Sequence, residues 1–75
     1  MRKEMLTYLL IEETTGRKVY EYYPEGNLNP GKVAFYSNGD KVLIEDSEDD
    51  FKGYYRGHAF SGIDQTKQQG TVAWC

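Results

Sequence analysis

Apolar and polar residues alternate over much of this chain in the pattern of β-strands. Two such runs, residues 5–13 and 17–23, flank a short loop containing Gly16, and together they predict a β-hairpin. Residues 8–11 are apolar on both faces of the expected strand, which indicates a position inside a sheet or against a helix. A helix over residues 3–13 is the alternative, because Met, Leu and Glu are good helix formers.

A second hairpin is predicted further along the chain. Residues 32–37 and 41–45 both read as strands, and Asn38-Gly39 between them is the strongest short-range signal for a hairpin turn. The segment that separates the two hairpins, residues 24–31, holds two prolines, two glycines and two asparagines. Such a composition predicts a loop.

Residues 45–50 contain five acids and one serine, and after them the period changes from that of a strand to that of a helix. Ser47 with Asp50 three residues later resembles a capping box, and acids in the first turn are favoured by the helix dipole. We therefore expect a helix that starts at Ser47 and is stopped by Gly70. Its buried face would carry positions 51, 54, 55, 58, 59, 62, 63 and 66.

Glycines within this expected helix count against it. Gly53, Gly57 and Gly62 each cost about 1 kcal/mol relative to Ala in a helix interior. Either the helix breaks near Gly57, or its backbone is pressed closely against another element. We predict one unbroken helix.

Residues 71–75 alternate as a short C-terminal strand, with Val72 and Trp74 on one face. The expected order is ββββαβ, a mainly antiparallel sheet of about five strands with one helix packed on it. This is an α+β fold. The 75 residues predict a single domain, 1–75, close to the lower size limit for folding alone.

The charge distribution makes some functions improbable. The net charge is −3, but residues 45–50 alone carry −5, which leaves nine bases against seven acids in the rest of the chain. Those bases are scattered and form no stripe, so direct nucleic-acid binding is not expected. The longest apolar run is only four residues and no signal-peptide core follows the start, so we expect no membrane contact and a cytoplasmic protein.

The candidate catalytic residues are few. Cys75 is the only cysteine, which excludes an internal disulfide, and His58 is the only histidine. No oxyanion loop accompanies them, and the acidic run lacks the glycine and the spacing of a calcium loop. We therefore predict no enzymatic activity and no cofactor. A small-ligand pocket around His58 remains an alternative.

The aromatic residues are the more promising feature. Seven Tyr, three Phe and one Trp are too many for so small a core to bury completely, and exposed Tyr and Trp are enriched in protein interfaces. The candidate interface or pocket residues are Tyr22, Tyr23, Tyr55, His58 and Trp74. Enlargement of a thin core explains these rings equally well.

The acidic run offers a second candidate contact. Asp46, Glu48 and Asp49 would occupy a basic groove on another protein, as in an inhibitor. The plain alternative is that they only start the helix.

Four segments of the chain resemble a family of short uncharacterised proteins of low-GC Gram-positive bacteria, some of them encoded on mobile elements. These segments are YYPEG at 22–26, PGKVAF at 30–35, YRGHA at 55–59 and GTVAWC at 70–75. The resemblance covers about residues 19–75. It implies a bacterial, cytoplasmic origin and brings no activity with it.

These observations favour a small non-enzymatic domain that binds a protein partner or associates with itself as a homodimer. An inhibitor encoded by a mobile element, acting through the acidic run, is the first alternative. The ligand pocket around His58 is the second.

Overall fold

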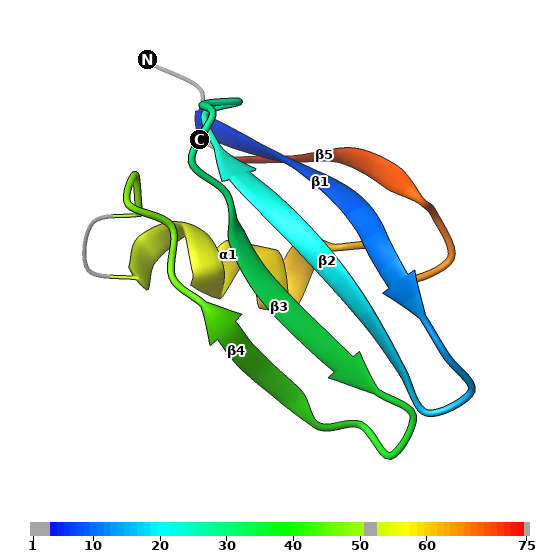
Figure 1. Cartoon of the computed structure of the whole chain (residues 1–75). Helices are drawn as coiled ribbons and strands as arrows, with labels where there is room; N and C mark the ends of the chain where they lie inside the picture. Colours follow the sequence, from blue (N-terminus) through cyan, green and yellow to red (C-terminus); the bar gives the residue numbers. More distant parts are fainter. Residues whose placement is uncertain (1–3, 51–52, 75) are drawn as a thin grey trace.

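The computed structural model describes residues 4–50 and 53–74. They form five strands and one helix in the order ββββαβ, so the predicted α+β fold is confirmed (Figure 1). The elements are β1 (Glu4–Glu13), β2 (Arg17–Pro24), β3 (Gly31–Tyr36), β4 (Lys41–Glu45), α1 (Tyr54–Gly62) and β5 (Gln69–Trp74).

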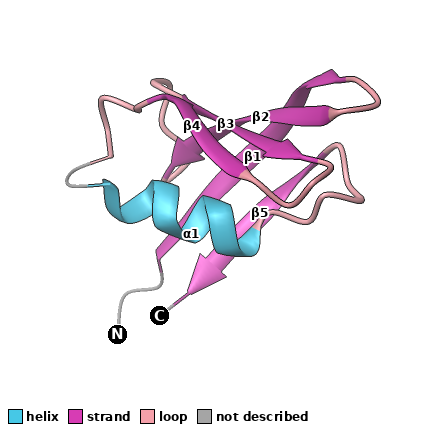
Figure 2. Cartoon of the chain, turned by 90° about the horizontal axis from the view of Figure 1, so that it is seen from below, coloured by secondary structure: helices cyan, strands magenta, loops and turns pink. Residues whose placement is uncertain are grey.

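All five strands belong to one antiparallel sheet in the order β4-β3-β2-β1-β5. The two predicted hairpins are β1–β2 and β3–β4, and β5 returns to pair with β1. Residues 4–13 are a strand inside the sheet, so the helical alternative for residues 3–13 is wrong over its described part. The helix α1 lies across one face of the sheet, and Figure 2 shows both layers from below.

The core lies between α1 and the sheet face that α1 covers. Alternate residues of the three inner strands point into it and meet two residues from the helix and its end. These buried residues are Leu6, Tyr8, Tyr20, Tyr22, Val33, Phe35, Ala59 and Ile63. Edge-to-face ring contacts at 5.7–6.2 Å link Tyr8, Tyr20, Phe35 and Phe60 in turn. Tyrosine rings thus provide much of a core that aliphatic residues alone would leave thin.

The helix starts later than the sequence predicted. It begins at Tyr54 after Gly53, whose φ is 72°, and no acid lies in its first turn. Ser47 is buried in a turn, where its hydroxyl donates to the carbonyl oxygen of Asn29 and accepts the N–H of Asp49 at 3.1 Å. The Ser47 start is therefore wrong, because its hydroxyl is used within the turn.

Asp50 caps the helix from outside. Its carboxylate accepts the N–H of Tyr55 at 2.8 Å and that of Arg56 at 2.9 Å. A negative charge therefore does meet the N-terminal N–H groups, as the dipole argument expected, but it comes from Asp50 alone. The predicted helix position 51 lies outside the described residues.

The helix also ends earlier than predicted, at Gly62 and not near Gly70. Ile63 is extended and turns its side chain into the core, and a carboxylate oxygen of Asp64 accepts the N–H of Thr66 at 2.9 Å. This side-chain turn competes with a further helical turn. Gly70 belongs to β5, which starts at Gln69, two residues before the predicted strand, and residue 75 lies outside the described residues.

Close packing explains two of the glycines. A Cβ on Gly62 would lie 2.5 Å from a methyl group of Val72, and one on Gly70 would lie 2.5 Å from the hydroxyl of Tyr8. At Gly57 nothing lies within 4 Å of such a Cβ. The helix continues through Gly57 without a break, as predicted, and close approach to β5 accounts for Gly62.

Candidate functional site

The face of the sheet opposite α1 is covered by no element that the structure describes (Figures 1 and 2). Val19, Ala34 and Val42 form a row across three strands on this face. Val19 and Ala34 are buried by their neighbours, whereas Val42 at the end of the row is 43% exposed. Leu9, on the same face of β1, is 40% exposed. The uncovered face therefore presents aliphatic side chains to solvent.

Two irregular points in the outer part of the sheet expose further aliphatic residues. Ile11 of β1 and Ile44 of β4 each lie where the pairing register shifts by one residue, as in a β-bulge. They are 43% and 47% exposed. The large aliphatic residues exposed on the strands thus lie on the uncovered face or at these bulges, and none of them belongs to the core cluster.

Charged groups on this face pair within the chain. Arg17 donates to the carboxylate of Glu12 at 2.8 Å and to the hydroxyl of Tyr36 at 3.2 Å. Lys32 lies 3.8 Å from a carboxylate oxygen of Glu45. These pairs are largely exposed and add little stability. They do leave both signs of charge on this face.

A shallow groove of about 660 Å³ lies at the β5 side of the uncovered face. Its walls include Thr7 and Leu9 of β1, Thr71 of β5, and Leu28 of the loop between β2 and β3. Leu28 is 91% exposed. The groove and the exposed leucines form a continuous surface that runs to the β5 edge.

The structure brings together three of the five predicted aromatic-site residues, Tyr55, His58 and Trp74. The rings of His58 and Trp74 stack with centroids 3.7 Å apart and an interplanar angle of 7°. Tyr54, which was not among the predicted site residues, joins them at 5.1 Å from His58 and 5.9 Å from Trp74. Because Tyr54 precedes His58 by four residues, helical spacing was the signal that pointed to it.

Hydrogen bonds fix the position of Trp74 within this cluster. Its indole N–H donates to Glu4 at 3.0 Å and to the hydroxyl of Tyr54 at 2.8 Å, and the hydroxyl of Tyr55 donates to Glu25 at 2.8 Å. The stacked rings leave no space for a ligand between them. This arrangement does not favour the predicted pocket around His58, and its evident effect is to hold the end of β5 against α1.

The other two predicted residues, Tyr22 and Tyr23, do not reach this cluster. Tyr22 is buried in the core and its hydroxyl donates to Asp50 at 3.2 Å. Burial, together with the charge of Asp50, raises the pKa of Tyr22 to about 12. Tyr23 points to the uncovered face, where it lines the groove and donates to Glu21 at 2.8 Å, a hydrogen bond that raises the pKa of Tyr23. Successive strand residues face opposite sides, so the pair had to separate.

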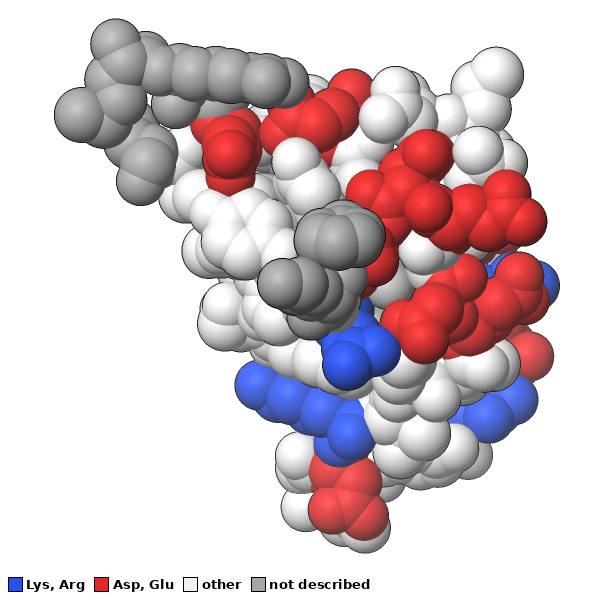
Figure 3. Space-filling view, turned by 90° about the vertical axis from the view of Figure 1, so that its left-hand side faces the viewer, with Lys and Arg blue, Asp and Glu red and all other residues white. Residues whose placement is uncertain are grey.

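The three predicted acidic contact residues have different surroundings. Asp46 pairs with Arg56 at 2.8 Å, Glu48 is exposed, and Asp49 is half-buried. Glu21 of β2, which sequence reasoning missed, joins Glu45, Asp46 and Glu48 around a hollow of about 250 Å³. Figure 3 shows acidic side chains gathered on this part of the surface. Glu21 and Glu45 come close together because β2 and β4 both pair with β3.

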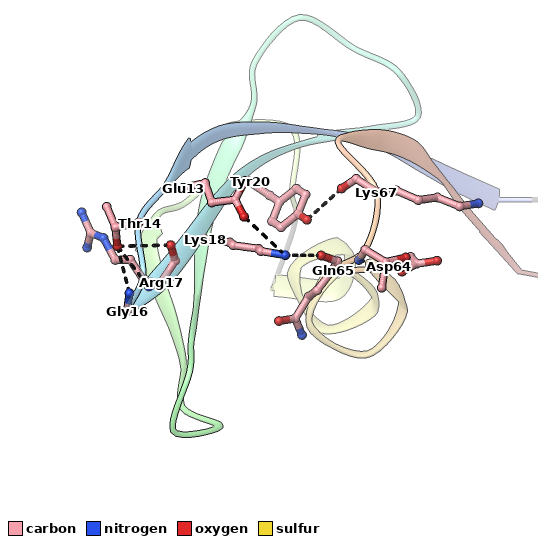
Figure 4. A network of polar contacts seen from close by, with 10 residues as sticks. Glu13, Thr14, Gly16, Arg17, Lys18, Tyr20, Asp64, Gln65 and Lys67 are labelled. Carbon is pink, nitrogen blue, oxygen red and sulfur yellow. Dashed lines mark hydrogen bonds and ion pairs between the residues drawn. The ribbon is translucent and has the colours of Figure 1, made fainter.

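The segment between α1 and β5 is tied back to β2 (Figure 4). The ammonium of Lys18 donates to the carbonyl of Gln65 at 2.6 Å and lies 3.8 Å from a carboxylate oxygen of Glu13. The hydroxyl of Tyr20 donates to the carbonyl of Lys67 at 2.9 Å. These contacts, with the Trp74 cluster, hold β5 at both ends.

Within residues 4–50 and 53–74, no three His, Cys, Asp or Glu side chains are arranged to hold a metal, and no helix is long and apolar enough to cross a membrane. Comparisons of the chain with protein-family models, curated proteins and solved structures found no match. The resemblance to a Gram-positive bacterial family stays a prediction. Any functional conclusion therefore rests on the surface itself.

Proposed function

We propose that this protein is a small non-enzymatic interaction domain that forms a homodimer through the β5 side and uncovered face of its sheet. The observation that carries the proposal is the exposure of Leu9 and Leu28 beside the groove at the β5 side of a sheet face that no described helix covers. Exposed apolar patches on a folded domain are typical of interaction sites.

The charges on this face favour a second copy as the occupant. Arg17 with Glu12, and Lys32 with Glu45, are pairs of opposite sign, and the acidic hollow of Glu21, Glu45, Asp46 and Glu48 lies toward β4, at the other side of the sheet from β5. Two identical copies of a strongly acidic surface would repel each other. The β5 side of the face carries no such acidic cluster and meets its own copy without that cost.

Light scattering on a sizing column tests the proposal at several protein concentrations. The wild-type mass is expected to rise from 8.7 kDa toward twice that value. A variant with Leu9→Glu and Thr71→Glu, which places charges at two exposed positions on the β5 side of the face, should stay monomeric. The matched control is Ser61→Glu on the exposed surface of α1, which should associate as the wild type does. A monomeric wild type at all concentrations would reject the proposal.

A second candidate function is inhibition of a protein with a basic groove, such as a nucleic-acid enzyme. Glu21 favours it, because this residue extends the predicted acidic contact beyond residues 45–50. Nuclease and polymerase activities should then fall in the presence of the protein. The combined change Glu21→Gln, Glu45→Gln and Glu48→Gln should restore them. If the wild-type protein inhibits none of the nucleases and polymerases tested, this function is rejected.

A further inference from the structure

Each of the two outer strands has an edge that no other described strand pairs with, and the two edges differ. At β4 the pairing with β3 contains a bulge between Lys32 and Val33, and the strand begins with Lys41 and ends with Glu45. Bulges and charged residues are the usual means by which natural sheets prevent pairing at an edge. The edge of β4 is therefore protected.

The edge of β5 has no such protection. Its residues Gln69–Trp74 read QGTVAW, with no charge and no proline. Its pairing with β1 runs from Glu4↔Trp74 to Leu9↔Gln69 without a register shift. A regular, uncharged edge is a template for another strand.

The hydrogen-bond pattern shows which groups of β5 face outward. The N–H of Leu10 donates to the carbonyl of Gln68 at 2.7 Å, so residue 68 bonds toward β1. In an antiparallel ladder the bonded residues alternate, and the N–H and C=O groups of Gln69, Thr71 and Ala73 consequently point away from β1. These three residues are also exposed at their side chains.

We propose that β5 pairs with β5 of a second copy, antiparallel and with the two-fold axis at Thr71, so that the two sheets become one. This inference rests on the proposed self-association and names the strand that carries it. In this register Thr71 lies opposite its own copy, Gln69 lies opposite Ala73 of the second copy, and about six backbone hydrogen bonds form. No pair of like charges is brought together, because β5 carries none.

The proposed pairing forms a closed dimer, to which no further copy can be added in the same way. Pairing about a two-fold axis uses both β5 edges, and the edges that remain are the two copies of the protected β4. The assembly therefore stops at a dimer and does not grow into a fibre. One protected and one unprotected edge is the combination that such a closed pair requires.

Strand β5 is also fixed in an extended conformation before a second copy binds. The stacking of His58 on Trp74 fixes one end of β5, and the hydrogen bond from Tyr20 to Lys67 fixes the segment just before the other end. Little backbone entropy is then lost when the second strand arrives. Pairing of six residues buries less area than a standard interface, so the dimer is expected to be weak and to depend on concentration.

Amide hydrogen exchange measured by NMR at low and high protein concentration tests the proposal on the wild-type chain. The N–H groups of Gln69, Thr71 and Ala73 should exchange at least about tenfold more slowly at high concentration. Lys41 and Leu43 serve as internal controls, since the bond from the N–H of Tyr36 to the carbonyl of Asp40 implies that they point outward from β4. Their exchange should be the same at both concentrations.

Two proline variants complete the test. Thr71→Pro removes an N–H that points away from β1, so the pairing of β5 with β1 should be kept while the dimer is lost and the mass stays at 8.7 kDa. Lys41→Pro, at the other edge of the sheet, should still form the dimer. A wild-type dimer in which the three β5 amides are not protected would overturn the β5 pairing and leave self-association through another surface. A wild type that is monomeric throughout would overturn both. Should Thr71→Pro fail to fold, the exchange of the wild type decides.

Discussion

Removal of the Asp50 carboxylate by Asp50→Ala should strongly destabilise the domain. The carboxylate accepts two N–H groups at the start of α1, from Tyr55 and Arg56, and the hydroxyl of the buried Tyr22. Loss of a helix cap costs about 1 kcal/mol, and weakening the hydrogen bonding of a buried hydroxyl costs about 1–3 kcal/mol more. We expect the free energy of unfolding to fall by about 2–4 kcal/mol, most of what a domain of this size has.

Urea unfolding followed by Trp74 fluorescence measures this change, at one low protein concentration so that association does not contribute. With a slope of about 1 kcal/mol per molar urea, the midpoint should fall by about 2 M or more. Asp50→Asn, which keeps one acceptor oxygen, should lose about half as much. The control Glu48→Ala, at an exposed acid of the same run, should change stability by less than about 0.5 kcal/mol. Equal effects of Asp50→Ala and Glu48→Ala would refute the capping argument.

Three further predictions follow from single contacts. Because the pKa of Tyr22 is raised to about 12, the folded state favours its neutral form, so the contribution of Tyr22 to stability should be constant below about pH 10 and be lost as the pH rises from about 10 to 12; urea titrations over that range should show a smaller fall in Tyr22→Phe. Gly57→Ala should add about 0.5–1 kcal/mol to the free energy of unfolding and so raise the melting temperature, since its new Cβ meets no other atom. Gly62→Ala should lower the melting temperature, because its new Cβ would collide with Val72. A change of the same sign in both variants would contradict this packing. Trp74→Phe loses two hydrogen bonds and should cost about 1–2 kcal/mol in urea unfolding, and an unchanged midpoint would show that these bonds contribute nothing.

Most of the fold could be predicted from the sequence because strand alternation and turn residues act locally. The pattern at 32–37 and 41–45 with Asn38-Gly39 predicted a hairpin that the structure contains, with β3 at Gly31–Tyr36 and β4 at Lys41–Glu45. The predicted helix bounds were wrong because other local interactions competed with further helical turns at both ends. Ser47 bonds within a turn, and burial of Ile63 ended the helix early.

The candidate site was only partly predictable, because it depends on which strands become neighbours. Helical spacing brought Tyr54 to His58, and the contact of the helix with β5 placed Trp74 against both Tyr55 and His58. The proximity of Glu21 to residues 45–48 arises from strand pairing, which no local pattern specifies. The sequence did contain one indication of the uncovered face, because one predicted helix can cover only one face of a sheet of five predicted strands.

Sedimentation equilibrium of the wild-type protein over a wide concentration range tests the central claim most directly. Self-association through the β5 side of the sheet predicts an average mass that rises with concentration from 8.7 kDa and levels off at twice this value, without larger species. A mass of 8.7 kDa at every concentration would contradict the homodimer. A mass that keeps rising beyond the dimer would contradict the closed two-fold pairing.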